Sequence, residues 1–228
     1  MSRERPVRSG LTVSRIVVAV LACGSVLLAA EEKKPSRWEK AVQAFEQRDK
    51  TTPPPQNAIL FAGSSSIVGW KLPQSFPDLQ AINRGFGGSQ IADSTEFAPR
   101  LILPCKPRIV VFYAGDNDIA GGKSPEQVLE DFKAFVKAIH EPLPKTKIIF
   151  IAIKPSIARW RLADKMRAAN KLIEDYTKAN DLLSYVDVDK PMIGEDGKPR
   201  PELFVKDGLH LSPDGYKLWT ELLMPLLK

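Results

Sequence analysis

The sequence predicts an α/β protein: a three-layer αβα sandwich built on a mostly parallel five-stranded sheet. Short apolar, β-branched runs occur along the chain without the polar alternation expected of a strand that has one face in water. Longer segments with helical periodicity separate these runs, and this repeated order is typical of a parallel sheet covered on both faces. In such sheets ligands bind at the carboxyl ends of the strands, where loops lead into helices.

The individual elements follow from the spacing of the apolar residues. A first helix is expected at residues 31–50, because its apolar residues recur at helical spacing and three prolines at 53–55 end it. The short apolar runs that follow are expected to be the strands, and the amphipathic segments between them the helices. The strands are expected at residues 58–62, 81–83, 108–113, 147–153 and 183–188, and the helices at about 90–102, 125–140, 159–180 and 213–227.

The first 30 residues have the layout of a secretory signal peptide. Four arginines and one glutamate precede residue 16, and an apolar run of 15 residues follows at 16–30. Because this run is shorter than the roughly 20 residues of a membrane-spanning helix, we expect cleavage after Ala30 and no stable membrane insertion afterwards. Two alternatives remain open: a retained signal anchor, since Leu28 is large for its position before the cut, and lipidation at Cys23.

We therefore expect three segments and a secreted or periplasmic protein, with membrane anchoring as the alternative. The segments are a signal peptide at 1–30, an N-terminal helix and proline-rich linker at 31–56, and one domain at 57–228. This length suffices for a single domain with a substantial core. Whether residues 31–50 belong to that core or form a tether stays open.

Charge and cysteine content narrow the class of protein further. Loss of the leader lowers the formal charge from +6 to +3, and the basic residues are interleaved with acids, so nucleic acid is not implied as a partner. Cys105 is then the one remaining cysteine, which excludes an intramolecular disulfide although the compartment permits one. We interpret Cys105 as a buried, inert thiol.

The chain has two histidines, which narrows the choice of a general base. His140 ends a helical segment, where an imidazole can complement the helix C-terminus, and we interpret it as structural. His210 follows Asp207 by three residues, so one turn can bring the carboxylate to the imidazole. Far upstream, the serine run from Ser64 to Ser66 follows the first strand and supplies candidate nucleophiles.

Four motifs lie after the expected strands or before the last helix. They are Gly63-Ser64-Ser65-Ser66-Ile67-Val68-Gly69-Trp70, Asn83-Arg84-Gly85-Phe86-Gly87-Gly88-Ser89, Gly115-Asp116-Asn117-Asp118 and Asp207-Gly208-Leu209-His210. Each alone has an ordinary explanation, since Gly, Ser, Asn and Asp are common in turns and helix caps. In this order they resemble the SGNH hydrolases, also called the GDSL esterase/lipase family. The resemblance covers about residues 57–216 and implies the flavodoxin-like fold of that family.

The resemblance implies that Ser65 is the nucleophile. Ser65 stands two residues after Gly63, where the family places its serine, and its spacing to Trp70 fits a variant of the family motif. Ser64 stands where the family has an aspartate, and this departure leaves Ser64 and Ser66 as competitors for the role.

The resemblance also assigns the acid–base pair and the oxyanion donors. His210 would take the serine proton and later give it to the leaving alcohol, while Asp207 orients the imidazole. The backbone N–H of the nucleophile, the N–H of Gly88 and the side-chain amide of Asn117 would stabilise the tetrahedral intermediate, with Gly87 as the competitor of Gly88. This chemistry needs no metal and no organic cofactor.

Further polar residues are expected at the rim of the site. Arg84 and the pair Arg159-Trp160 follow strands, so these three could bind substrate, with surface arginines and a packed tryptophan as the alternative. Asp116, Asp118 and Lys123 could shape the pocket or hold its loop.

The leading functional hypothesis is an exported hydrolase that cleaves short acyl esters, foremost acetyl, on a small molecule or glycan. The short loops between the motifs offer no apolar lid for a long chain. The alternatives are a lysophospholipase or thioesterase with the same machinery, and an inactive carbohydrate-binding protein, which the loss of the aspartate at Ser64 motivates. Phosphate binding by the glycine loop, residues 85–88, is disfavoured. This loop has neither the glycine spacing of a P-loop nor that of a dinucleotide-binding motif.

Overall fold

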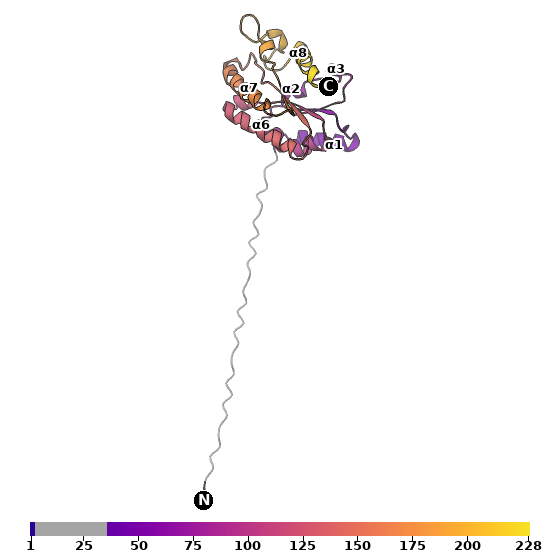
Figure 1. The fold of residues 1–228 in the computed structure, drawn as a ribbon, viewed down its shortest axis with the longest axis vertical. Helices are drawn as coiled ribbons and strands as arrows, with labels where there is room; N and C mark the ends of the chain where they lie inside the picture. The colour runs from indigo at the N-terminus through magenta and orange to yellow at the C-terminus, as the bar shows by residue number, and fades with distance from the viewer. Residues whose placement is uncertain (3–35) are drawn as a thin grey trace. The chain divides into compact units, whose positions relative to one another are not determined.

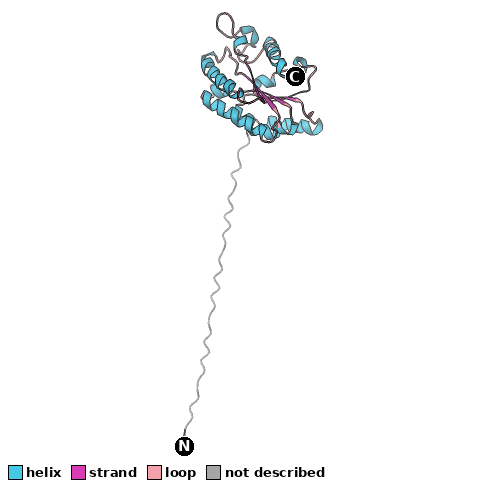
Figure 2. Ribbon diagram, viewed as in Figure 1, coloured by secondary structure: helices cyan, strands magenta, loops and turns pink. Residues whose placement is uncertain are grey.

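The computed structural model describes residues 1–2 and 36–228, and the fold is that of residues 36–228. Five parallel strands form one sheet in the order β2-β1-β3-β4-β5, flanked by helices (Figure 2). The predicted sandwich is thus confirmed, and every strand pair of the sheet is parallel. The strands are β1 (Ile59–Gly63), β2 (Ala81–Gly85), β3 (Ile109–Tyr113), β4 (Lys147–Ile151) and β5 (Leu183–Val186).

Helices cover both faces of the sheet. One face carries the long helices α4, α6 and α7 together with α1, and the other carries α8 with the short helices α2 and α3 (Figure 1). The long helices are amphipathic, as the sequence pattern requires, and bury their apolar stripes against the strands. Their bounds are α1 (Glu39–Thr51), α2 (Ser65–Val68), α3 (Leu72–Ser75), α4 (Ile91–Leu101), α5 (Asp116–Ala120), α6 (Pro125–His140), α7 (Ala163–Thr177) and α8 (Pro213–Leu223).

The strands are apolar throughout because both of their faces are buried. Along β3, Val110 and Phe112 join the core beneath α4 and α6, whereas Ile109 and Val111 join the core beneath α8. Alternate side chains of a strand point to opposite faces, so a strand between two helical layers has no polar position. The runs that predicted the sheet are the consequence of this double burial.

The structure refines several predicted bounds. The helix expected at 159–180 begins only at Ala163, after a 3-10 turn at Trp160–Leu162, and the helix expected at 213–227 ends at Leu223 before a 3-10 turn at Met224–Leu226. The short helices α2, α3 and α5 were not predicted, since four or five residues give no periodic signal. Three further 3-10 turns lie at Leu103–Cys105, Lys190–Met192 and Pro201–Leu203.

The N-terminal segment is described from Ser36 onward. The expected helix at 31–50 corresponds to α1, and residues 31–35 and the expected leader at 1–30 lie outside the described residues, apart from residues 1–2. Within the described residues, no helix is both long enough and apolar enough to cross a membrane. Val42 of α1 is fully buried in the core beneath α4, so this helix packs on the domain.

Strand order places the candidate site. After β1 the chain continues into α2 on one face, and after β3 it continues through α5 into α6 on the other face. Adjacent strands whose connections diverge in this way leave a crevice between their carboxyl ends, which is where open α/β sheets bind ligands. The motifs at Gly63-Ser65 and Gly115-Asn117 therefore face the same crevice.

We expect Phe135→Ala to lower the free energy of unfolding by about 3–5 kcal/mol, because it removes a buried ring from the core. Phe135 of α6 is fully buried and stacks on Phe112 of β3 with ring centroids 3.9 Å apart. The measurement is the urea midpoint at constant m-value. The matched control is Lys137→Ala on the exposed side of the same helix, which should change stability by less than about 0.5 kcal/mol. Equal effects of the two variants would contradict the packing described.

Candidate active site

Ser65 is placed by a tight turn at the end of β1. Gly63 has a φ of +128°, and a Cβ at this position would lie 1.9 Å from the carbonyl oxygen of Tyr113 on β3. A residue without a side chain is therefore required here. The Ser64 N–H donates to that same carbonyl at 3.0 Å, and Ser65 follows as the first residue of α2.

His210 and Asp207 complete a hydrogen-bonded chain with Ser65. The Nε2 atom of His210 lies 3.0 Å from Ser65 Oγ, and its Nδ1 atom lies 2.6 Å from Asp207 Oδ2. The other oxygen of Asp207, Oδ1, accepts hydrogen bonds from the backbone N–H groups of Leu209 at 2.8 Å and His210 at 2.9 Å. The structure thus brings together the three residues that the sequence singled out as nucleophile, base and orienting acid.

Hydrogen bonding keeps the Asp207 carboxylate charged. The bond to the His210 side chain, followed by the two backbone N–H bonds, holds the pKa of Asp207 well below its ordinary value. An anionic Asp207 makes Nδ1 of His210 the protonated nitrogen, which leaves Nε2 free to accept a proton from serine. Both side chains are open to solvent, at 48% exposed for Asp207 and 42% for His210.

The serine competitors occupy different environments. The Oγ atoms of Ser64 and Ser66 are buried and have no hydrogen-bond partner among the described residues. Only the middle serine of the run contacts His210. The second histidine, His140, ends α6 and bonds through Nε2 to the carbonyl oxygen of Thr146 at 2.9 Å, which is a structural contact remote from the crevice.

Two backbone N–H groups and one side-chain amide are the candidate oxyanion donors. The N–H groups of Ser65 and Gly88 have no acceptor among the described residues. Gly88 adopts a φ of +74°, a conformation that glycine tolerates at little cost. Asn117 Nδ2 donates one hydrogen bond to Ser89 O at 3.0 Å, which joins the segment after β3 to the segment after β2. The second hydrogen of this amide stays available to a ligand.

Arg159 and Asp116 orient the Asn117 amide. Arg159 donates from Nη2 to Asn117 Oδ1 at 3.0 Å and from Nη1 to Asp116 Oδ2 at 3.0 Å. With its oxygen held by a guanidinium, the Asn117 amide must present its NH₂ group toward the crevice. Arg159 was predicted as a substrate-binding residue; the structure shows its bonds to Asp116 and Asn117, and its contact with substrate stays a prediction.

A buried lysine lies beneath these groups. Lys154, three residues after the end of β4, donates to Tyr113 Oη at 3.0 Å and lies 3.4 Å from Asp116 Oδ2. Burial lowers the pKa of Lys154, partly against the effect of Asp116, and burial together with Asp116 raises the pKa of Tyr113. In the sequence this lysine is a single charge directly after the apolar run that ends at Ile153, and that pattern alone predicts no role for it.

Asp118 holds its loop rather than lining the pocket. Its buried carboxylate accepts from Lys123 Nζ at 2.9 Å and from the Ile91 N–H at the start of α4 at 3.3 Å. Burial raises the pKa of Asp118, against the opposing effect of Lys123. This carboxylate joins the β3 loop to the helix that follows the glycine loop.

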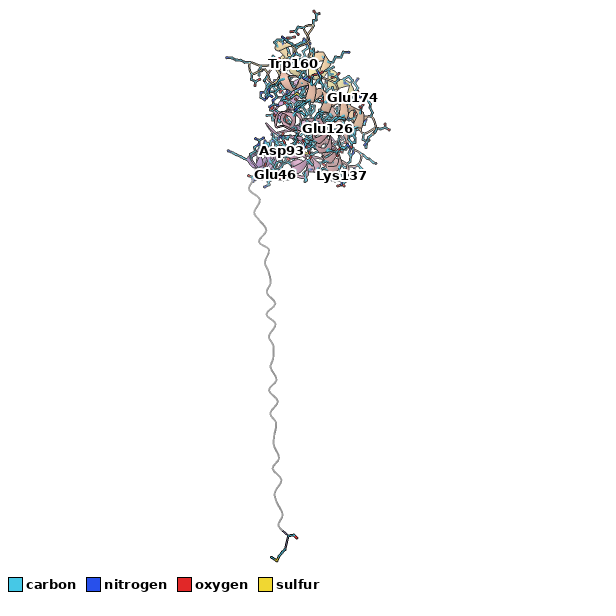
Figure 3. The ribbon with its side chains drawn as sticks, turned by 90° about the vertical axis from the view of Figure 1, so that its left-hand side faces the viewer. Glu46, Asp93, Glu126, Lys137, Trp160 and Glu174 are labelled. Atoms are coloured by element: carbon cyan, nitrogen blue, oxygen red, sulfur yellow. The ribbon has the colours of Figure 1, made fainter. Side chains whose placement is uncertain are left out.

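Arg84 and Trp160 were also predicted to lie at the rim of the site. Arg84 does not reach the rim: its side chain is 1% exposed and pairs with Asp49 of α1 at 2.6 Å, with the thiol of Cys105 nearby. The alternation along β2 turns its side chain under α1, which the sequence could not show. Trp160 lies half-exposed at one end of the domain, far from Glu46 of α1 (Figure 3), and Arg167 packs over its ring at 5.2 Å.

The prediction that Cys105 is a buried thiol is confirmed. Cys105 is a buried free cysteine, and burial raises the pKa of its thiol. Among the described residues, no group of three or more His, Cys, Asp or Glu side chains is arranged to hold a metal ion.

A serine, an imidazole and a carboxylate in line at the carboxyl edge of a parallel sheet are the groups that acyl transfer through a serine nucleophile requires. Residues 57–218 match the GDSL-like lipase/acylhydrolase family, and the chain belongs to this family. It is therefore a hydrolase of the class that acts on ester bonds, and the resemblance drawn from the four motifs is confirmed. No curated protein matches the chain in sequence.

Solved structures share the fold. A GDSL-like lipase from Bacteroides thetaiotaomicron is 23% identical, with a TM-score of 0.71 over 82% of this chain and 96% of that chain. An acetyl esterase variant crystallised with acetate is 17% identical, with a TM-score of 0.59 over 74% and 95%. A carbohydrate esterase of family 3 from Talaromyces cellulolyticus is 18% identical, with a TM-score of 0.59 over 74% and 95%. At such identities the likeness concerns the fold.

The lowered pKa of Asp207 predicts how stability depends on pH. A carboxylate whose pKa is lower in the folded protein stabilises the fold above its unfolded pKa of about 3.9, and this contribution disappears as the pH falls through the folded pKa. The difference in unfolding free energy between wild type and Asp207→Asn should not shrink from pH 7 to about pH 5 and should shrink below about pH 4. Urea unfolding of both proteins across this range measures it, and a difference that shrinks between pH 7 and 5 would contradict the assignment.

Proposed function

We propose that the protein is an exported serine hydrolase that removes short acyl groups, foremost acetyl, from a polar alcohol such as a carbohydrate. The hydrogen-bonded chain from Ser65 Oγ through His210 to Asp207, at 3.0 and 2.6 Å, carries the proposal. A serine hydroxyl is a weak nucleophile unless a base in direct contact accepts its proton, and this contact is present before substrate arrives. The family places the chain among ester hydrolases.

The proposed reaction proceeds in two displacements. Ser65 Oγ attacks the ester carbonyl while His210 Nε2 accepts its proton, and anionic Asp207 stabilises the resulting imidazolium. Collapse of the tetrahedral intermediate breaks the bond to the alcohol, which leaves with the proton from His210. Water then attacks the acyl-serine by the same route and releases the acid.

Three donors support the proposed oxyanion hole. The N–H groups of Ser65 and Gly88 and the second hydrogen of Asn117 Nδ2 have no other acceptor among residues 36–228. Removing one such donor elsewhere lowers kcat by about 10²–10³. Since Arg159 and Ser89 fix the Asn117 amide from both ends, it needs no reorientation when charge develops on the substrate oxygen.

The openness of the site favours a bulky polar alcohol and a small acyl group. His210 and Asp207 lie at the surface, so the alcohol portion can remain in solvent while the carbonyl enters the crevice. The shared fold with an acetyl esterase and a carbohydrate esterase is consistent with this substrate class.

A second candidate is the hydrolysis of esters or thioesters with longer acyl chains. A cavity of about 320 Å³ lies between α1 and the glycine loop, and it is lined by Ala41, Phe45, Val68 and Gly87 among others. Val68 is 52% exposed, three residues after the nucleophile. An apolar chain occupying this cavity would account for that exposure.

Export is proposed from the leader alone. Four arginines before residue 16 and an apolar run at 16–30 support a signal peptide cleaved after Ala30. Sequencing the N-terminus of the protein recovered from the producing cell distinguishes cleavage from a retained anchor or a lipidated Cys23.

We expect Ser65→Ala and His210→Ala each to lower kcat/KM for p-nitrophenyl acetate by about 10³-fold or more, because the two residues act as one unit. The matched control is Ser66→Ala, which removes the hydroxyl of the adjacent buried serine and should leave kcat/KM within a few-fold. Steady-state kinetics together with labelling by a serine-directed phosphonate test this. Turnover that survives the loss of Ser65 would overturn the mechanism, and absence of all turnover would favour a binding protein.

Acyl length is tested with p-nitrophenyl acetate, butyrate and octanoate and with an acetylated glycan. We expect kcat/KM to fall by about tenfold or more from acetate to octanoate, since mismatched methylenes in a pocket cost factors of this order. Hydrolysis by Ser65→Ala gives the background for each ester. A preference for octanoate would instead select the longer-chain function and predict that Val68→Ser lowers octanoate turnover more than acetate turnover.

A further inference from the structure

Two side chains at the start of α1 contact the glycine loop that carries a candidate oxyanion donor. Trp38 Nε1 donates to Gly87 O at 2.9 Å, and Arg37 Nη2 donates to Gly88 O at 2.7 Å. The Arg37 guanidinium stacks over the Trp38 ring at 4.0 Å, and that ring packs edge-on against Phe86 at 5.9 Å. Both residues lie outside the four motifs and outside the residues that match the family.

The contact of Trp38 fixes the direction of the Gly88 N–H. Gly87 C=O and Gly88 N–H belong to the same planar peptide unit, and in a trans peptide they point in opposite directions. An indole that holds the carbonyl oxygen on one side therefore aims the N–H to the other side. No described residue accepts from that N–H, which leaves it available to a ligand.

The glycine loop needs such a contact. Gly87 and Gly88 each have wide backbone freedom, and Gly88 has a φ of +74°. A Cβ on Gly87 would lie 3.9 Å from the Cβ of Ser65, so the loop passes directly over the nucleophile. A donor on a freely moving peptide would have to be ordered during the reaction, and the rate would suffer accordingly.

The helix that carries Trp38 is itself anchored to the domain. Arg100 of α4 binds both Glu39 at 2.8 Å and Glu46 at 2.7 Å, the first residue of α1 and a residue in its middle. The buried Arg84 holds Asp49 in the last turn, and Val42 is fully buried between these contacts. Glu46 and Asp93 of α4 lie on the same flank of the domain in Figure 3.

We propose that Trp38 is a positioning residue of the active site, which acts by orienting the Gly87-Gly88 peptide so that Gly88 N–H meets the substrate oxyanion. The inference rests on the proposed function, since it gives a role to a donor of that mechanism. It makes α1 part of the catalytic apparatus.

The test is Trp38→Phe in the protein lacking residues 1–30. Phenylalanine keeps a ring against Phe86 and beneath Arg37 but removes the indole donor. We expect kcat for p-nitrophenyl acetate to fall by about tenfold to a hundredfold, less than the 10²–10³ expected for complete loss of a donor, with KM within about twofold and Tm unchanged. The affinity for an aryl trifluoromethyl ketone, which adds to Ser65 to form a tetrahedral oxyanion, should fall by the same factor as kcat/KM.

The control separates positioning from general stability. Arg108→Ala removes the hydrogen bond from Arg108 Nη2 to Leu227 O, just before the amino end of β3, and touches neither α1 nor the glycine loop. It should lower Tm by about 2–4 °C and leave kcat within twofold. A loss of kcat in Arg108→Ala that matches the loss in Trp38→Phe would mean that the effect of Trp38 reflects stability alone and would overturn the inference.

The failure of the inference and the failure of the proposed function look different. If Ser65-dependent turnover is present and Trp38→Phe matches wild type in kcat and in ketone affinity, the inference is wrong while the mechanism stands. If turnover does not depend on Ser65, the mechanism itself is wrong, and there is no oxyanion toward which Trp38 could orient the Gly88 N–H.

Discussion

The site depends on the close approach of β1 and β3 at their carboxyl ends. Because Gly63 has no side chain, the carbonyl of Tyr113 comes to where its Cβ would stand, and β1 can end in a turn that begins α2 with Ser65. After β1 the chain continues on one face of the sheet, and after β3 it continues on the other face. The edge between the two strands therefore stays open. Ser65 and Asn117 become neighbours at this edge for a reason of backbone geometry, far apart as they are in sequence.

Beneath this edge lies a group of charges whose burial is costly. Lys154, Asp116 and Arg159 offset part of that cost by pairing with one another. The arrangement also orients Asn117, because Arg159 bonds to both Asp116 Oδ2 and Asn117 Oδ1, and Lys154 lies against the same oxygen of Asp116. Apolar replacements would remove the desolvation cost, but the Asn117 amide could then turn its oxygen toward a developing negative charge.

The sequence predicted what local pattern encodes. Double burial made the strands apolar runs, and the three-residue spacing of Asp207 and His210 lets one turn join them, so both could be recognised without a structure. Contacts between distant elements leave no such pattern. The side of β2 from which Arg84 emerges, and the helix that covers it, decided that this arginine pairs with Asp49 rather than with substrate. The short helix α2 was invisible because four residues cannot show a period.

Trp38 illustrates the same limit and its physical meaning. Glycines let the loop after β2 approach the nucleophile, yet their freedom works against an oxyanion donor that must stand ready before charge develops. Rigidity has to come from outside the loop, and here it comes from α1, which precedes the range matched by the family. Motifs record the groups that act on substrate, whereas the groups that hold them can lie wherever the fold brings a donor to the right carbonyl. An account of this site that began at residue 57 would therefore include the Gly88 N–H and omit the contact that aims it.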